Sequence, residues 1–284
     1  MQKVTAAGLT AWYTQLRREQ GYALTTIRHV HNILKPAFDD AVTWGLLVKS
    51  PVVGAKTPKD EYGLDDTEDG VKGREKAWTR SELHTFLRQA RGHRLYPLFH
   101  LMAATGLRRK EVLGLKMAML SLENATVFIT SGRTTAGGQA IDTGPKSKRS
   151  KRRLPLDEDT VAVLKSWMAQ RASDQLAAGP AWRDTGYVFV KPDGTPYYPD
   201  HISKLGSRFI KAAQMAPRDL PRVLYDLRHS YATLLIDAGE PVQVVSERLG
   251  HASVAFTLDH YVDVTDRQRE GIVETTRKLL SAFE

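Results

Sequence analysis

The sequence predicts a mainly helical α+β protein, with a small all-helical domain joined to a larger mixed domain that contains a three-stranded sheet. Apolar residues recur at helical spacing along most of the 284 residues, whereas alternating, strand-like segments cluster between residues 125 and 156. Residues 56–76 have almost no apolar periodicity and contain three glycines and seven acidic residues. This segment predicts a linker between a first domain, residues 1–55, and a second domain, residues 77–284.

Two amphipathic stripes predict the helices of the first domain. They consist of Leu9, Trp12, Tyr13 and Leu16, followed by Ile27, Val30, Leu34, Ala37, Phe38 and Ala41. Pro36 lies within the second stripe. Because proline lacks a backbone N–H, we expect it to kink this helix or to split it in two.

Capping residues and turns delimit the elements of the second domain. Its first helix is predicted at a capping box formed by Thr79 and Glu82. Further helices are predicted near 95–105 and 108–117 with Gly106 between them, from Asp157 to Met168, from Pro199, from Leu227 to Gly239 and from Pro241 to Gly250. Strands are predicted at "ATVFITS" (125–131), "GGQAIDT" (137–143), "RRLPL" (152–156) and "YVFV" (187–190).

Composition narrows the class of protein. The 41 basic and 32 acidic residues give a net charge of +9, which fits a polyanionic partner such as nucleic acid or a merely basic surface. The absence of cysteine excludes disulfides, thiolate metal sites and a cysteine nucleophile. No run approaches the ~18 apolar residues of a membrane span, and the N-terminus lacks the apolar core of a signal peptide. We therefore expect a cytoplasmic protein with no membrane partner.

Two groups of charged residues precede the helix at 157. Arg108 starts a helix with Glu111 one turn later, a pair that is commonly a solvated salt bridge. The loop "GPKSKRSKRR" lies between two predicted strands and fits a DNA backbone contact, a solvated loop or a localisation signal. Its basic residues are Lys146, Lys148, Arg149, Lys151, Arg152 and Arg153.

Two further groups lie near the C-terminus. Arg228 and His229 stand at the start of a predicted buried helix, where a cation needs an anionic partner. His251 follows a helix stop, and Tyr261 comes ten residues later. Either residue alone is more often structural than functional.

The order and setting of these residues carry more information than each residue alone. The segments "TGLRRKE", "PKSKRSKRRLPL", "YDLRHSYATLL" and "LGHASVAFTLDHY" strongly resemble the tyrosine recombinases, the phage integrase family, and the resemblance covers residues 77–265. The first domain is similar to the family's helical core-type DNA-binding domain. The resemblance implies a C-shaped clamp around duplex DNA, without metal or other cofactor.

The resemblance also implies a function. We expect site-specific strand exchange, for the integration or excision of a phage or mobile element, by a bacterial or phage-encoded protein. A homotetramer would assemble on paired sites, with accessory DNA-bending proteins as further partners. Longer members carry an additional N-terminal domain for arm-type DNA sites, which we expect this chain to lack.

The resemblance assigns a chemical role to each group. Tyr261 would attack the phosphorus and form a 3′-phosphotyrosine ester, so that rejoining needs no ATP. Arg108 and Arg228 would hold the nonbridging oxygens, and His251 would donate a further hydrogen bond. A lysine of the basic loop would protonate the leaving 5′ oxygen, with Lys146 assigned and Lys148 as the alternative. Glu111 would brace the site, and Lys148, Arg149, Lys151 and Arg152 would contact DNA.

One position departs from the family pattern. Tyr225 stands three residues before Arg228, where the family usually has a histidine. A phenol is a poor base near neutral pH, so we expect Tyr225 to keep a phosphate contact and to give up some proton transfer. His229 lies about 100° around the helix from Arg228, and we expect it not to substitute directly.

The C-terminal segment and three other functions remain open. Residues 268–284 predict an amphipathic helix that either packs on its own domain or docks on a neighbouring subunit. A type IB topoisomerase uses nearly the same constellation of residues. A non-enzymatic regulator is suggested by the helix-turn-helix pattern of residues 230–250 but leaves Arg108, Lys146 and Tyr261 unexplained. A metal-dependent nuclease is disfavoured because acidic residues cluster in the linker.

Overall fold

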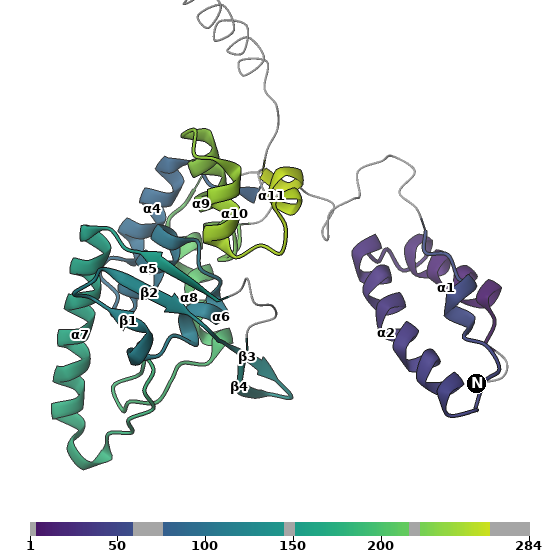
Figure 1. Cartoon of the computed structure of the whole chain (residues 1–284), viewed down its shortest axis with the longest axis horizontal. Helices are drawn as coiled ribbons and strands as arrows, with labels where there is room; N and C mark the ends of the chain where they lie inside the picture. Colours follow the sequence, from purple (N-terminus) through teal and green to yellow (C-terminus); the bar gives the residue numbers. More distant parts are fainter. Residues whose placement is uncertain (1–3, 59–75, 145–150, 216–221, 262–284) are drawn as a thin grey trace, which may run out of the picture. The chain divides into compact units, whose positions relative to one another are not determined.

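The computed structural model describes residues 4–58, 76–144, 151–215 and 222–261, and the chain divides into two compact units, Met1–Lys72 and Gly73–Glu284 (Figure 1). In the N-terminal unit, α1 (Ala6–Arg18), α2 (Leu24–Thr43) and the 3₁₀ turn η1 (Pro51–Gly54) pack on one another. Their shared core contains Leu9, Tyr13, Leu16, Ile27 and Val52.

Pro36 lies inside α2, which continues to Thr43, so of the two expected outcomes, a kink or a split, the split does not occur. Pro36 is exposed, and on that face of the helix water can satisfy the carbonyl that has lost its backbone donor. The helix therefore tolerates the proline without ending.

The helices of the C-terminal unit begin largely where the capping residues indicated. They are α4 (Arg80–Ala90), α5 (Tyr96–Thr105), α6 (Arg109–Leu113), α7 (Glu158–Ala178), α8 (Pro199–Ala212), α9 (Asp226–Asp237), α10 (Val242–Leu249) and α11 (Val254–Tyr261), with 3₁₀ turns η2 (Met117–Met119) and η4 (Gly179–Ala181). Thr79 and Glu82 form the expected capping box of α4, and Asp157 caps α7. α6 is shorter than predicted, because it ends before Gly114, a poor helix former.

The predicted three-stranded sheet is confirmed, but its membership differs from the prediction. Strands β1 (Leu120–Ser121), β2 (Thr126–Ile129) and β5 (Arg152–Pro155) form an antiparallel sheet in the order β1-β2-β5. The segment "GGQAIDT" does not join it: β4 (Gln139–Thr143) pairs with β3 (Gly132–Ala136) in a separate hairpin. Gly137 and Gly138 both have positive φ and form the two-residue turn of this hairpin, rather than the start of a strand.

The segment "YVFV" is not a strand. Tyr187 and Val190 each form only an isolated bridge, to Lys116 and Pro196 respectively. The four residues 187–190 are nevertheless buried, so their apolar character reflects the core rather than a sheet.

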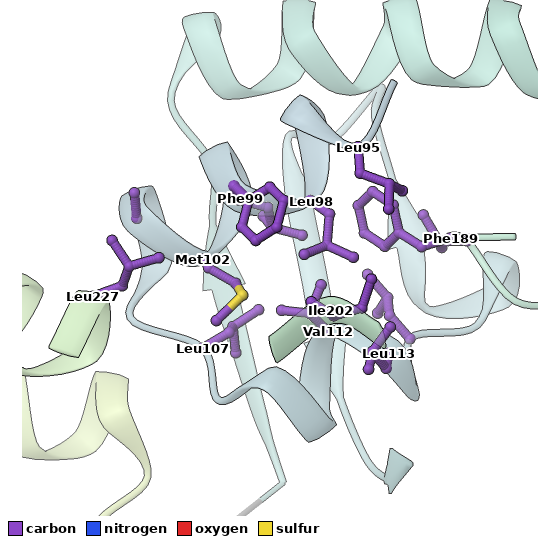
Figure 2. Packing of buried hydrophobic residues seen from close by; sticks show 14 of the residues in the cluster. Leu95, Leu98, Phe99, Met102, Leu107, Val112, Leu113, Phe189, Ile202 and Leu227 are labelled. Atoms are coloured by element: carbon purple, nitrogen blue, oxygen red, sulfur yellow. The ribbon is translucent and has the colours of Figure 1, made fainter. Parts of the chain in front are cut away.

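A large hydrophobic core positions α5, α6 and the start of α9, and a second, smaller core lies among α9, α10 and α11. Figure 2 shows Leu98, Phe99 and Met102 of α5 in the large core, with Leu227 of α9 at its edge. α5 also contacts α6 and α9, while α9, α10 and α11 contact one another (Figure 1). The end of α5, the start of α9 and the α10–α11 junction are thereby brought together.

Candidate active site

Arg228 lies in the first turn of α9 and is only 1% exposed. Its Nη1 donates to the carbonyl of Gly106 at 2.9 Å, and its Nη2 donates to the carbonyl of Leu249 at 2.8 Å. Its Nε is buried and has no hydrogen-bond partner among the described residues. Burial and the neighbouring Arg108 lower the pKa of Arg228 to about 10, so the guanidinium stays charged at neutral pH.

Gly106 allows α9 to lie close to the end of α5. It ends α5 in the left-handed conformation, with φ of +64°. A Cβ at this position would lie 2.5 Å from Cδ1 of Tyr231 and 2.8 Å from Cδ2 of Leu249. The predicted helix stop therefore also places one of the two carbonyls that hold Arg228.

Glu111 is a buried anion that pairs with two arginines. Its carboxylate accepts hydrogen bonds from the backbone N–H of Arg108 at 2.9 Å and from the Arg108 guanidinium at 3.0 Å. It also accepts from Arg152 at 3.0 and 3.3 Å. Burial opposes ionisation, but Arg152, Arg228 and Arg108 together lower the pKa of Glu111 to about 2. Glu111 thus pairs with two guanidinium groups and lies within electrostatic reach of a third, that of Arg228, so the cluster has an excess of positive charge.

Arg152, which the family resemblance assigned to DNA contact, is buried within the cluster. It lies in β5 rather than at the tip of a loop, and it is 7% exposed. Besides Glu111, its guanidinium donates to the carbonyl of Arg248 at 2.7 Å. These internal partners occupy the guanidinium, so Arg152 braces the cluster in this arrangement.

Tyr261, at the end of α11, is 2% exposed and packs in a small core with Ala232 and Leu249. Its hydroxyl lies 2.8 Å from Nδ1 of His229. Burial raises the pKa of Tyr261 to about 12, although the positive charges of Arg228 and Arg108 act in the opposite direction. The hydroxyl is therefore protonated at neutral pH and lies within electrostatic reach of both arginines.

His251 follows the left-handed Gly250 that ends α10 and is 6% exposed. Its Nδ1 lies 2.7 Å from Oγ1 of Thr257, and its ring is parallel to that of Tyr261 at a centroid distance of 6.1 Å. Burial, together with Arg228 and other nearby cations, lowers the pKa of His251 to about 3. At neutral pH this imidazole is uncharged and acts through hydrogen bonds alone.

Tyr225 is the exposed member of the cluster, with 46% of its surface accessible. Its ring meets the edge of His229 at 5.0 Å. Burial lowers the pKa of Arg108, but Glu111 and Tyr225 outweigh burial and raise it. Tyr225 thus interacts with Arg108 from the solvent side and acts at longer range on Arg228 in the interior.

An open groove of about 830 Å³ adjoins His251. One side is formed by residues 151–155, and the other by residues 243–248 of α10. Lys151 and Arg153 are exposed there, and Arg248 also lines the groove, so basic side chains border the approach to the cluster.

Some predicted residues lie outside the described residues. These are Lys146, Lys148 and Arg149 of the basic loop and the C-terminal segment 268–284. Of the other predicted residues, the structure brings together Arg108, Glu111, Tyr225, Arg228, His229, His251 and Tyr261. Within the part of the chain that the structure describes, no helix is long and apolar enough to cross a membrane, and no group of acidic or histidine side chains could hold a metal ion.

Two contacts were missed by sequence reasoning although the sequence held a signal for each. In "RRLPL", Arg152 and Leu154 are two residues apart and therefore share the buried face of the strand. Tyr225 and His229 are four residues apart and share one face of a helix. The expectation for His229 was based on its angle from Arg228 and did not take its spacing from Tyr225 into account.

Comparisons with known proteins show the family of this chain. A model described as "Phage integrase family" matches residues 79–268. A tyrosine recombinase XerC-like protein of Caldanaerobacter subterraneus subsp. tengcongensis is 29% identical over 278 residues, which cover 92% of this chain and 68% of the relative. The ICEBs1 integrase of Bacillus subtilis is 28% identical over 284 residues, 99% of this chain and 72% of the relative.

Solved structures show the same fold at lower identity. The Tn1549 transposon integrase in complex with transposon right end DNA matches with a TM-score of 0.75 at 20% identity, covering 96% of this chain and 86% of that chain. A lambda integrase dimer bound to a core site matches with a TM-score of 0.60 at 15% identity, covering 94% and 67%.

Proposed function

The chain belongs to the phage integrase family, the tyrosine recombinases, and on that premise we propose that it integrates or excises a mobile element by means of Tyr261 as nucleophile. It is a DNA strand breaking-and-rejoining enzyme that acts at specific sites. The observation that supports our assignment of Tyr261 is its position, with its hydroxyl within electrostatic reach of Arg108 and Arg228 and its ring parallel to His251.

The two arginines would bind the nonbridging oxygens of the scissile phosphate. Guanidinium groups are always charged at neutral pH and match the planar geometry of such oxygens. Arg228 is held by two carbonyls, which fix its position but supply no negative charge. A phosphate would be the anionic partner that a buried cation at the start of a helix requires.

His251 would act as a neutral hydrogen-bond donor to the same phosphate. When the Thr257 hydroxyl donates to Nδ1, the uncharged imidazole carries its proton on Nε2, which then serves as the donor. The low pKa of about 3 supports this role, because the ring does not need to gain a proton to act. By the family resemblance, Lys146 would protonate the leaving 5′ oxygen.

Tyr225 would retain a hydrogen bond to the phosphate where the family usually has a histidine. Its exposure of 46% and its interaction with Arg108 support this placement. Because a phenol transfers protons poorly near neutral pH, we expect Tyr225→His to cleave faster than the wild type. Equal single-turnover rates at every pH would contradict this reading of Tyr225.

Duplex DNA is the partner of this enzyme, and further parts of the assembly belong to the proposal. The two units would close around the duplex as a C-shaped clamp, and residues 268–284 would join neighbouring subunits in a tetramer on paired sites. Deleting these residues should abolish assembly on paired sites and leave single-site binding intact. Accessory DNA-bending proteins would favour integration or excision.

Covalent trapping tests the proposed nucleophile. Wild type, Tyr261→Phe and the control Tyr197→Phe would each be incubated with labelled, nicked duplexes from DNA that flanks the protein's own gene. Tyr197 is a buried tyrosine of the same unit that bonds Arg94, away from this cluster. A protease-sensitive, slow-migrating label with wild type and Tyr197→Phe, but not with Tyr261→Phe, is expected. An adduct that persists in Tyr261→Phe would refute the assignment.

A further inference from the structure

The contact between Tyr261 and His229 bears on a step that the proposed roles leave unassigned. A tyrosine that attacks phosphorus must lose its phenolic proton. With a pKa of about 12, only about one hydroxyl in 10⁵ is ionised at neutral pH. Some group must therefore accept the proton as the oxygen–phosphorus bond forms.

His229 is placed to accept that proton. Its Nδ1 lies 2.8 Å from the Tyr261 hydroxyl, within the range over which general bases act, and its ring centroid lies 5.7 Å from that of the tyrosine. His229 is 9% exposed, so little bulk water competes for the contact. The geometry joins α9, which carries Arg228, to α11, which carries the nucleophile.

The other aromatic groups of the cluster are less suited to this step. His251 contacts the Thr257 hydroxyl through Nδ1, and its ring lies parallel to that of Tyr261 at a centroid distance of 6.1 Å. With a pKa of about 3, it is also a very weak base. Tyr225 is a phenol, which accepts a proton far less readily than an imidazole.

The sequence explains how His229 reaches this position. It lies four residues after Tyr225, so the two side chains share a face of α9 and their rings meet at 5.0 Å. Tyr225 points to solvent at the start of the helix, and His229 lies one turn deeper, beside Tyr261. The residue that departs from the family pattern is thus next to an imidazole that can supply the missing base.

We propose that His229 is the general base that accepts the proton of the Tyr261 hydroxyl as this tyrosine attacks DNA. The inference rests on the proposed function and assigns a step within it. His229 contacts Tyr225 at the start of its own helix and Tyr261 on α11, and the arginines at positions 108 and 228 act on the same Tyr261 hydroxyl.

The proton balance of the step is complete in both directions. In cleavage, the bond from tyrosine oxygen to phosphorus forms, the bond from phosphorus to the 5′ oxygen breaks, and the phenolic proton moves to Nδ1 of His229. The leaving 5′ oxygen takes its proton from the lysine assigned by resemblance, Lys146. In rejoining, the 5′ hydroxyl attacks, its proton returns to the lysine, and the departing tyrosine oxygen recovers its proton from the His229 imidazolium.

Single-turnover cleavage of a nicked duplex tests this role. His229→Gln keeps a polar side chain of similar size but cannot accept a proton, and His84→Gln is a control at an exposed histidine of α4. We expect His229→Gln to bind DNA as wild type does and to cleave at least about 100-fold more slowly near neutral pH. Its rate should rise with pH more steeply than that of wild type, because ionised tyrosine then replaces the general base.

A second substitution separates proton transfer from a structural role. Replacing Tyr261 with a fluorinated tyrosine of lower phenolic pKa should restore most of the rate in the His229→Gln background and change the wild-type background little. A rate within about threefold of wild type in His229→Gln, or a slow variant that neither high pH nor fluorotyrosine rescues, would overturn the inference. Absence of any adduct in wild type would instead refute the proposed function itself.

Discussion

Replacing Glu111 with glutamine should destabilise the C-terminal unit by an amount that depends on pH. The pKa of this carboxyl falls from 4.5 to about 2 in the folded protein. A lowering of this size corresponds to roughly 3 kcal/mol of favourable interaction with the ionised form, since each pKa unit is worth about 1.4 kcal/mol. Glu111 is 5% exposed, so solvent screens this interaction little.

The sign of the pH dependence follows from the direction of the shift. Because the folded pKa lies below the unfolded one, the stabilisation is fully present above pH 4.5 and is lost as the pH falls towards 2. At pH 7, Glu111→Gln should therefore unfold at a temperature lower by roughly 6–12 °C, from about 2–4 °C per kcal/mol for a domain of this size. At pH 3 the difference from wild type should be clearly smaller.

Differential scanning calorimetry at pH 7 and pH 3 measures this difference. Glu123→Gln is the matched control, because Glu123 is an exposed carboxylate of the same unit. The control should unfold within about 1 °C of wild type at both pH values. If Glu111→Gln were as stable as wild type at pH 7, or if its deficit were equal at both pH values, the cluster would not depend on the charge of Glu111.

Three further predictions concern other parts of the site. Gly106→Ala should lose at least about 1–2 kcal/mol in thermal unfolding, because alanine is strained at φ of +64° and its Cβ would lie 2.5 Å from the Tyr231 ring. Asp142→Asn weakens the contact between β4 and Arg133, and β4 precedes Lys146, the proposed acid, in the sequence. We therefore expect slower cleavage of ordinary DNA. Cleavage of DNA with a bridging 5′ sulfur should stay near normal, because the departure of sulfur needs no acid. Lys151→Gln should lower DNA affinity and reduce the slope of its salt dependence by about 1, as measured by titration at several salt concentrations, whereas Lys165→Gln on α7 should change neither.

The helices could be predicted because residues at or next to their ends determine where they begin and stop. A capping box at Thr79, an aspartate at 157, a proline at 199 and a glycine at 250 each act within one turn of the residue concerned. Sheet membership depends on partners that are distant in sequence, so local patterns did not predict it. The segment after Gly138 alternates as a strand does, but the two-glycine turn pairs it with its immediate predecessor, β3.

The sequence predicted which residues form the site, but it did not predict the hydrogen bonds and ion pairs that these residues make with one another and with the backbone. The family resemblance selected Arg108, Arg228, His251 and Tyr261, which the structure brings together. The partners of these residues include backbone carbonyls. Because every residue has a backbone carbonyl, the sequence does not indicate which of them accept these hydrogen bonds. Arg152 illustrates the difficulty, because a run of basic residues reads as one surface although alternate residues of a strand face opposite sides.

The charge balance of the cluster links its stability to its chemistry. Glu111 pairs with Arg108 and Arg152 and acts on Arg228 at longer range, while burial and repulsion by Arg108 lower the pKa of Arg228. A second carboxylate in the cluster would relieve the repulsion between Arg108 and Arg228 in the free protein. It would also neutralise the positive charge that attracts a phosphate. Holding Arg228 with the carbonyls of Gly106 and Leu249 satisfies its N–H groups and leaves its charge available. The free site therefore retains its positive charge, and under the proposed function a phosphate diester would supply the counter-charge and the phosphorus that Tyr261 attacks.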